Sequence, residues 1–256
     1  MVPNRVSSGR ETRSDPATAT GQLRVLQQRV IACARCPRLI RYCRRVATEK
    51  RPLYRDAEYW GKPLPSFGDP GAELLIVGLA PAAHGGNRTG RMFTGDRSGD
   101  FLYRTLCEAG WANQPLSRDR DDGLELRGCY ITAALRCAPP ANKPRPQELR
   151  RCRSWLEAEL ALLQRVRAVL TLGRIAFEAY LVTVYRPETF PPRSSFRFAH
   201  GATYALPGGL PRLFASYHPS QQNTLTGRLT HKMMMEVLVS IRLFLASEGG
   251  GPRAGD

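Results

Sequence analysis

Four short apolar runs mark the places where strands are expected along this chain. They lie at residues 74–77, 129–135, 168–172 and 212–217. The first is bounded by glycine and contains no polar position, which is typical of a strand that is covered on both faces. All four are short enough to be strands of one sheet rather than helices.

Helical patterns separate these runs. Apolar residues that recur three and four positions apart predict helices at residues 23–31, 98–111, 146–163, 175–185 and 229–246. A repeated alternation of strand and helix is typical of an α/β protein with a parallel sheet. We therefore predict an α/β fold, a three-layer α/β/α arrangement around a central four-stranded, mainly parallel sheet.

The same pattern indicates one domain between two tails. Residues 21–246 contain every periodic segment and are expected to form a single domain, while residues 1–20 should be a disordered basic tail and residues 247–256 a flexible tail. Three connections stand out: an extended one at 51–70, a charged and solvated loop at 117–127, and a proline- and glycine-rich stretch at 186–211 with short pairing segments.

The net charge of the chain indicates which kind of partner it binds. The 256 residues include 38 basic and 22 acidic ones, a net charge of +16, and such a chain attracts polyanions, of which nucleic acid is the first candidate. No apolar run reaches the roughly 18 residues that a membrane span needs, and no signal-type apolar core is found near Met1. We expect a soluble, cytoplasmic monomer that associates with the nucleoid through DNA and not with a membrane.

Each predicted strand is followed by a polar motif. The longest is the glycine-rich loop at 78–96, GLAPAAHGGNRTGRMFTGD, and the others are APPANKP at 138–144, Gly173-Arg174, and HPS at 218–220. Because the carboxyl ends of parallel strands meet at one edge of a sheet, these motifs should converge on one ligand site. An ordinary glycine-rich surface connection is the alternative, and the absence of GxGxxG or GxxxxGK[ST] excludes a dinucleotide or P-loop site.

Seven cysteines in a cytosolic chain favour metal binding over disulfides. Cys33 and Cys36 form a CxxC, which is also compatible with a redox motif or chance, and Cys137 and Cys152 provide a second pair. Four sulfurs in two pairs suit either zinc or an iron–sulfur cluster, although Cys152 could also be a small core residue. Cys107 and Cys129 lie on apolar faces and are expected in the core, and Cys43 has no assigned role.

Together, the motifs resemble those of the uracil-DNA glycosylase superfamily, specifically its family 5, the B-type enzymes with an iron–sulfur cluster. GLAPAAHGGNRTGRMFTGD is similar to that family's first motif, RCAPPANKP to its middle motif, and HPSQQNTLTGRLT to its last. Cys33, Cys36, Cys137 and Cys152 match the four cluster ligands. The resemblance thus implies a [4Fe-4S] cluster with a structural role.

Two positions distinguish this chain from related families. Ala80 stands where several of them have a carboxylate or amide that activates water, and Ala133 stands where they read uracil with an asparagine. Family 5 is similar in lacking the first polar group and in accepting a wider range of deaminated bases. The resemblance therefore implies release of uracil, hypoxanthine and xanthine from double-stranded DNA, which leaves an abasic site.

The resemblance also suggests roles for the residues around the flipped base. His218 would donate a hydrogen bond to the departing base, Phe93 would stack on its ring, and Gly78 would let the backbone approach it. Asn142 would hold the attacking water, with Asp96 as a second polar contact. The simpler alternatives are a core or capping His218, a packing role for Phe93, and a turn-forming Asn142.

Contacts with the duplex are expected around this site. Arg88, Arg91 and Arg228 would hold phosphates, and Leu225 would enter the minor groove as a wedge. Two other classes of protein share part of this pattern. A metal-stabilised nucleic-acid-binding module without catalysis would not need His218, and a hydrolase of free nucleosides would not need the large positive charge.

Overall fold

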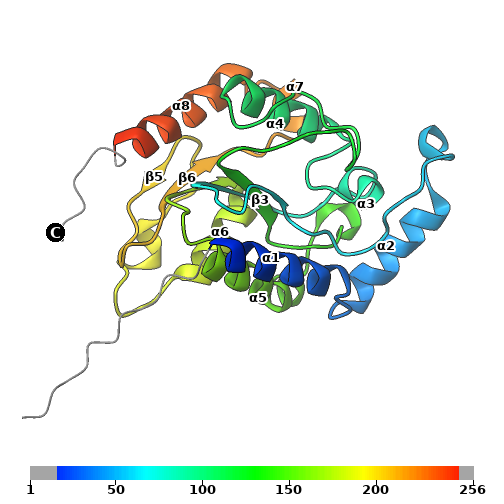
Figure 1. Ribbon diagram of the computed structural model, residues 1–256, viewed down its shortest axis with the longest axis horizontal. Helices are drawn as coiled ribbons and strands as arrows, with labels where there is room; N and C mark the ends of the chain where they lie inside the picture. Colours follow the sequence, from blue (N-terminus) through cyan, green and yellow to red (C-terminus); the bar gives the residue numbers. More distant parts are fainter. Residues whose placement is uncertain (1–15, 248–256) are drawn as a thin grey trace, which may run out of the picture.

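Within residues 16–247, which the computed structural model describes, six strands form one mixed sheet (Figure 1). Its order is β1-β3-β2-β4-β6-β5. The strands are β1 (Phe67–Gly68), β2 (Leu74–Gly78), β3 (Cys129–Ala133), β4 (Ala168–Leu172), β5 (Thr203–Tyr204) and β6 (Arg212–Ser216). The four strands that the apolar runs predict are therefore present, within a larger sheet than the predicted one.

The interior strands are parallel and the two edge strands are antiparallel. Ile76 of β2 pairs with Ile131 of β3 on one side and with Leu170 of β4 on the other, and β4 pairs in parallel with β6. β1 and β5 each add two residues in the antiparallel sense. The prediction of four strands is thus wrong by these two short edges, of which only β5 lies in a segment where pairing was expected.

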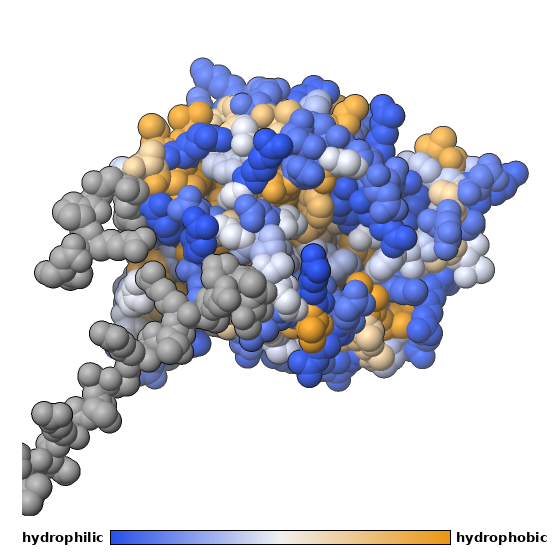
Figure 2. Space-filling model, in the orientation of Figure 1, coloured by the Kyte–Doolittle hydropathy of each residue, from blue (hydrophilic) through white to orange (hydrophobic). Residues whose placement is uncertain are grey.

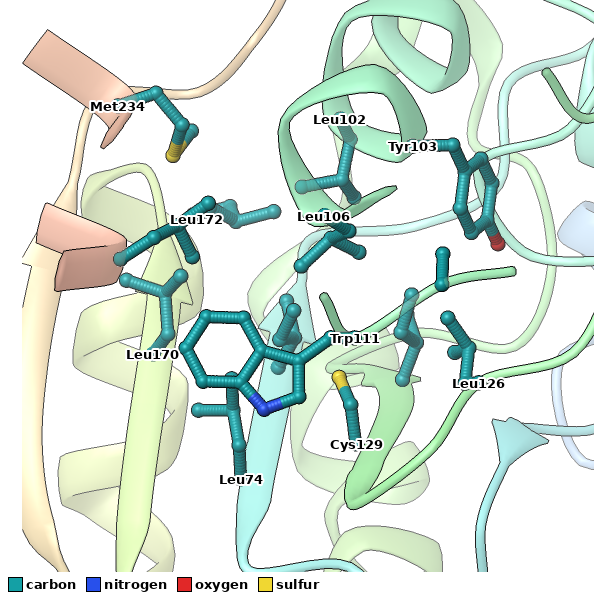
Figure 3. Packing of buried hydrophobic residues seen from close by; sticks show 14 of the residues in the cluster. Leu74, Leu102, Tyr103, Leu106, Trp111, Leu126, Cys129, Leu170, Leu172 and Met234 are labelled. Atoms are coloured by element: carbon teal, nitrogen blue, oxygen red, sulfur yellow. The ribbon is translucent and has the colours of Figure 1, made fainter. Parts of the chain in front are cut away.

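Helices cover both faces of the sheet. α1 (Pro16–Ile31), α5 (Pro146–Leu162) and α6 (Arg174–Val184) lie on one face, and α4 (Arg97–Glu108) and α8 (His231–Ser247) lie on the other (Figure 1). Leu102 and Leu106 of α4 pack with Met234 of α8 over Leu74 and Leu170 of the sheet (Figure 3). Side chains alternate between the two cores along each strand, which explains why the strand sequences carry no polar face.

Three further helices occur where none was predicted: α2 (Pro37–Glu49), α3 (Gly86–Thr89) and α7 (Gln221–Leu225). Two of them lie inside predicted loops, and α2 follows the CxxC. α1 begins at Pro16, so residues 16–20 of the predicted disordered tail are helical. The rest of that tail, and residues 248–256 of the predicted flexible tail, lie outside the described residues, within which no helix has the length and apolarity to cross a bilayer.

The charged segment 117–127 is a loop, as its sequence suggests, but it is only partly solvated. Ser117, Leu124 and Leu126 are buried, and Leu126 forms an isolated antiparallel bridge with Ala112. The two leucines join the core between α4 and the sheet. Apolar contacts of Leu124 and Leu126 therefore hold this segment against the core. The many charged residues around the two leucines made these contacts hard to predict from the sequence.

Candidate active site

A cavity of about 310 Å³ lies at the carboxyl ends of β2, β3 and β6. Its volume is in the range of small-ligand sites. Six of the seven residues predicted to catalyse or to bind the base line it, and Gly78 lies directly behind one of them. The lining comprises Leu79, Ala80, Pro81, Ala82, Met92, Phe93, Asp96, Ser98, Ala133, Pro139, Asn142, His218, Ser220 and Gln222.

Phe93 is held in place by two glycines. Its backbone has φ +52°, a conformation that bulky residues rarely adopt, and its ring lies against the Cα of Gly78. A Cβ on Gly78 would stand 2.8 Å from the ring, and a Cβ on Gly99 would collide with the Phe93 carbonyl. Phe93 therefore fits only because both neighbours lack a side chain.

His218 lies beside Phe93. The ring centroids are 6.0 Å apart and the ring planes are inclined by 32°. Asn223 donates from Nδ2 to the His218 carbonyl at 2.8 Å, and Gly173 packs against the His218 Cβ. Burial lowers the pKa of His218 to about 4, so the imidazole is neutral near pH 7 and still has one N–H to donate.

Asn142 reaches the cavity from a strained turn. Ala141 and Asn142 have φ values of +53° and +56°, two consecutive left-handed residues, and the Asn142 N–H is bonded to the Pro139 carbonyl at 3.1 Å. Among the described residues no side-chain partner of its amide is found, so the amide is available to a ligand or water. Its place in the turn therefore leaves the Asn142 amide free to contact a ligand in the cavity.

Asp96 has a structural role in addition to its place in the lining. Its Oδ1 accepts hydrogen bonds from the Ser98 and Gly99 N–H groups at 2.9 and 3.0 Å, which caps the N-terminus of α4. Burial raises the pKa of the carboxyl, and Oδ2 lies against Gly85. The cap fixes the loop that carries Phe93.

Ala80 and Ala133, which stand where related families have polar groups, form an apolar part of the cavity wall. The three other lining residues on the 79–82 segment, Leu79, Pro81 and Ala82, are likewise apolar. The polar groups that face the cavity therefore come from the other motifs.

Residues 65–242 match the model of the Uracil DNA glycosylase superfamily. A Type-5 uracil-DNA glycosylase of Thermus thermophilus is 53% identical over 215 residues, which is 84% of this chain and 94% of the relative. One of Pyrobaculum aerophilum is 47% identical over 82% of this chain and 88% of the relative. The chain belongs to family 5 of this superfamily. A Type-4 uracil-DNA glycosylase of Archaeoglobus fulgidus is less similar, with 27% identity over 61% of this chain and 70% of the relative.

The residues predicted to contact the duplex in this family 5 member differ in their exposure to solvent. Leu225, at the end of α7, is 69% exposed, and Arg228 is exposed with its guanidinium 4.8 Å from the Tyr217 ring centroid. Arg88 is half-buried and donates to the carbonyls of His84 and Gly95 at 2.9 and 3.0 Å. Leu225 and Arg228 can reach DNA as they stand, whereas Arg88 also holds its own loop together.

The assignment of Arg91 to a phosphate is wrong. Its side chain is only 3% exposed, and its Nη2 lies 2.7 Å from Asp122 Oδ2. It also donates to Ser117 and Thr94, and its guanidinium lies over the Phe67 ring. The partner was not anticipated because Asp122 belongs to the segment interpreted as a solvated loop.

The four predicted cluster ligands surround one small cavity. Cys33, Cys36, Cys137 and Cys152 all line it, and none of the seven cysteines of the chain forms a disulfide. Cys43 does not line this cavity; it is fully buried, packs in one cluster with Cys36 and Cys137, and its Sγ lies 3.7 Å from the Ala138 carbonyl. Cys129 is buried in the core as expected, and Cys107 packs at its edge.

A buried arginine makes this cavity suitable for an anionic group. Arg136 is fully buried, pairs with Glu159, and lines the cavity, while its Nε has no hydrogen-bond partner among the described residues. Burial raises the pKa of Cys152 to about 11, against the lowering effect of the Arg136 charge. No group of three or more His, Cys, Asp or Glu side chains within residues 16–247 is arranged to hold a single metal ion.

Proposed function

We propose that this chain is a monofunctional DNA glycosylase that hydrolyses the N-glycosidic bond of uracil, hypoxanthine and xanthine in double-stranded DNA. The observation that carries the proposal is the convergence of Phe93, His218 and Asn142 on one cavity at the edge of the sheet. A base buried in a duplex cannot reach such a cavity, so the nucleotide must rotate out of the stack. The names of the relatives, Type-5 uracil-DNA glycosylase, support the same reaction.

Catalysis acts on the leaving base. Phe93 stacks on the ring of the flipped base, and the neutral His218 donates its N–H to a base oxygen on which negative charge develops. As the bond between the base and C1′ breaks, the electron pair leaves with the base and the sugar becomes an oxocarbenium ion. A donor placed for the transition state in this way is worth about 10²- to 10³-fold in rate.

The attacking water is held rather than strongly activated. The free amide of Asn142 binds the water beside C1′, and Asp96 provides a second polar contact through the oxygen that does not cap α4. The water oxygen bonds to C1′ and its proton is released to the solvent or to the departing base. Because Ala80 supplies no carboxylate, general-base assistance of about 10²- to 10⁴-fold is at least partly absent.

The alanine at position 133 accounts for the proposed breadth of substrate. An asparagine there would select uracil through paired hydrogen bonds and would leave its own polar groups unpaired against another base. Ala133 makes no such demand, and its small side chain leaves room for a purine. Stacking on Phe93 likewise does not depend on the identity of the base.

We also propose that Cys33, Cys36, Cys137 and Cys152 hold a [4Fe-4S] cluster. The fit is supported by four free thiols around one cavity and by the unpaired Nε of Arg136, a donor for a sulfur of an anionic cluster. When bound, the cluster supplies a covalent cross-link between segments. The ligands at positions 33 and 36 would thereby tie the α1–α2 connection to the segment that also carries Asn142.

The experiment that tests the function is incubation of the protein with duplex oligonucleotides that contain uracil, hypoxanthine, xanthine or only normal bases. Alkaline cleavage then reveals any abasic site. The proposal requires strand cleavage at the three deaminated bases and none in the undamaged duplex. A binding module without catalysis would retain the damaged duplex and give no cleavage, and a nucleoside hydrolase would act on free deoxyuridine instead.

A further inference from the structure

The segment that follows α2 forms a projection with an apolar apex. We call residues 50–55, which contain the short helix η1 (Pro52–Tyr54), the η1 tip. It lies at the end of α2 that points away from the sheet (Figure 1). Leu53 is 82% exposed, more than any other large apolar side chain in the described part of the chain. Figure 2 shows an apolar patch at the end of this projection with hydrophilic surface around it.

The η1 tip is fastened to the glycine-rich loop of the active site. The Arg88 guanidinium lies 4.0 Å from the centroid of the Tyr54 ring. Just beyond the tip, the N–H groups of Trp60 and Gly61 donate to the carbonyls of Arg88 and Asn87 at 2.9 and 3.0 Å. The tip is therefore held in a fixed position relative to the loop that carries Phe93.

A second link runs through His84 of the same loop. The Tyr59 hydroxyl is 2.9 Å from His84 Nδ1. Burial, and then the positive charges of Arg51 and Arg88, lower the pKa of His84, which places Arg51 near the loop as well. The apolar apex and its flanking charges are thus linked to the loop at residues 84–88, whose continuation carries Phe93 into the cavity.

The charge around the apex is mainly positive. Arg51 and Arg55 are both exposed, and neither forms an ion pair with a described residue. Lys50 donates to the Arg55 carbonyl at 3.0 Å, which stabilises the turn. The outer face of α2 adds Arg41 and Arg44, while the exposed acids next to the tip are Glu49, Asp56 and Glu58, of which Glu49 pairs with Arg45. An exposed leucine between unpaired arginines suits a nucleic-acid groove lined by phosphates.

We propose that the η1 tip is a second duplex-binding element, in which Leu53 enters a groove and Arg51 and Arg55 hold phosphates. The proposal rests on the proposed function. It parallels the arrangement at α7, where Leu225 is 69% exposed and Arg228 follows it. The α7 segment lines the cavity through Ser220 and Gln222, and the tip contacts Arg88 of the loop that continues to Phe93. The duplex would thus be held at two separate segments of the protein, α7 and the η1 tip.

The test measures binding rather than base release. Affinity of the full chain for a fluorescent duplex with a stable abasic-site analogue is followed by anisotropy over a range of salt concentrations. Leu53→Ala should weaken binding about 3- to 10-fold, consistent with the loss of one buried apolar side chain. The double variant Arg51→Gln/Arg55→Gln should lower the salt slope by about two, one for each phosphate contact.

Matched controls are available elsewhere on the surface. Leu243→Ala removes an apolar side chain of α8 that is 66% exposed, and Arg186→Gln removes an exposed charge just after α6, at the opposite edge of the sheet from the cavity. Both controls should bind DNA as the unaltered protein does. Equal affinities and salt slopes for the tip variants and these controls would overturn the proposal. So would a tip variant whose DNA binding is unchanged but which no longer binds a protein partner.

The two proposals fail in different ways. If the unaltered protein binds the duplex but releases no base from a uracil oligonucleotide, the glycosylase function fails and the binding role of the tip is still decided by anisotropy. If base release is normal and the tip variants bind like the controls, only the tip proposal fails.

Discussion

A Cβ atom placed on Gly78 would lie 2.8 Å from Cζ of the Phe93 ring. Real Cβ atoms do not approach a carbon so closely, and here the neighbour is a rigid ring whose own backbone is fixed by Gly99. The last residue of β2 therefore determines where the aromatic wall of the cavity lies. Glycine is needed at position 78 because the Phe93 ring occupies the space of a Cβ atom, and not because the Gly78 backbone needs an unusual conformation.

Substitution of Gly78 should disable the pocket without unfolding the protein. Gly78→Ala is expected to displace the Phe93 ring and to lower base release about 10- to 100-fold, the effect of a misplacement of about 1 Å. Single-turnover release from a uracil duplex measures this. Gly21→Ala is the control, since no atom lies within 4 Å of the added Cβ, and it should keep full activity.

The low pKa of His218 makes a prediction about stability. Its pKa is about 4 in the folded protein and about 6.5 in the unfolded chain, so the unfolded state binds more protons between these values. The stability contributed by a neutral His218 is thus present above about pH 6.5 and is lost as the pH falls towards 4, by up to roughly 3 kcal/mol. Denaturant unfolding at several pH values should show a smaller loss over this window for His218→Gln.

Base release should not depend on an imidazolium. Because His218 donates in its neutral form, the single-turnover rate is expected to change little between pH 5.5 and 8, a range that begins about 1.5 units above the folded pKa. A rate that falls with rising pH through the ordinary histidine range would mean that the protonated form is required. The same profile for His218→Gln separates this group from others.

Arg91 and Arg228 should respond in opposite ways. Asp122→Ala leaves the buried Arg91 charge without its partner and is expected to lower the free energy of unfolding by about 3 to 5 kcal/mol, with no change in the salt dependence of DNA binding. Arg228→Gln should leave the melting temperature unchanged and lower the salt slope by about one. A salt slope that changes in Asp122→Ala at a temperature where it is folded would restore Arg91 to the DNA interface.

Loss of one proposed cluster ligand should be visible without an activity assay. Cys152→Ser is expected to abolish stoichiometric iron and sulfide in protein purified without oxygen, together with the brown colour. The melting temperature should fall because the cross-link between segments is lost. Cys107→Ser, on the edge of the core, is the control and should keep its iron. Zinc in place of iron in the unaltered protein would contradict the cluster.

The elements that can be predicted from sequence are those whose burial is continuous. The runs at β2 and β4 are buried at every residue, and their sequences are apolar apart from Thr171 of β4. β1 has only two residues, too few for any period to show. α2 was missed although Leu39, Cys43 and Val46 recur at helical spacing, because four arginines and a CxxC in the neighbourhood suggested another kind of segment.

The site could be predicted where it depends on topology and not where it depends on distant partners. Motifs at the ends of parallel strands meet at one edge, so Phe93, Asn142 and His218 were found together. The ion pair of Arg91 with a residue 31 positions away depends on packing that no local pattern records. The capping of α4 by Asp96 is a local contact. From the sequence alone, however, an aspartate before a helix could either cap that helix or contact a ligand, and the structure was needed to show the cap.

The most direct test of the central claim, that one pocket releases the base through a neutral imidazole, compares His218→Ala with the unaltered protein on the same uracil duplex. Binding to a duplex with an abasic-site analogue is measured in parallel, so that recognition and chemistry are separated. We predict nearly equal binding and a single-turnover rate of uracil release that is about 10²- to 10³-fold lower in the variant. Equal rates of release in the two proteins would contradict the account.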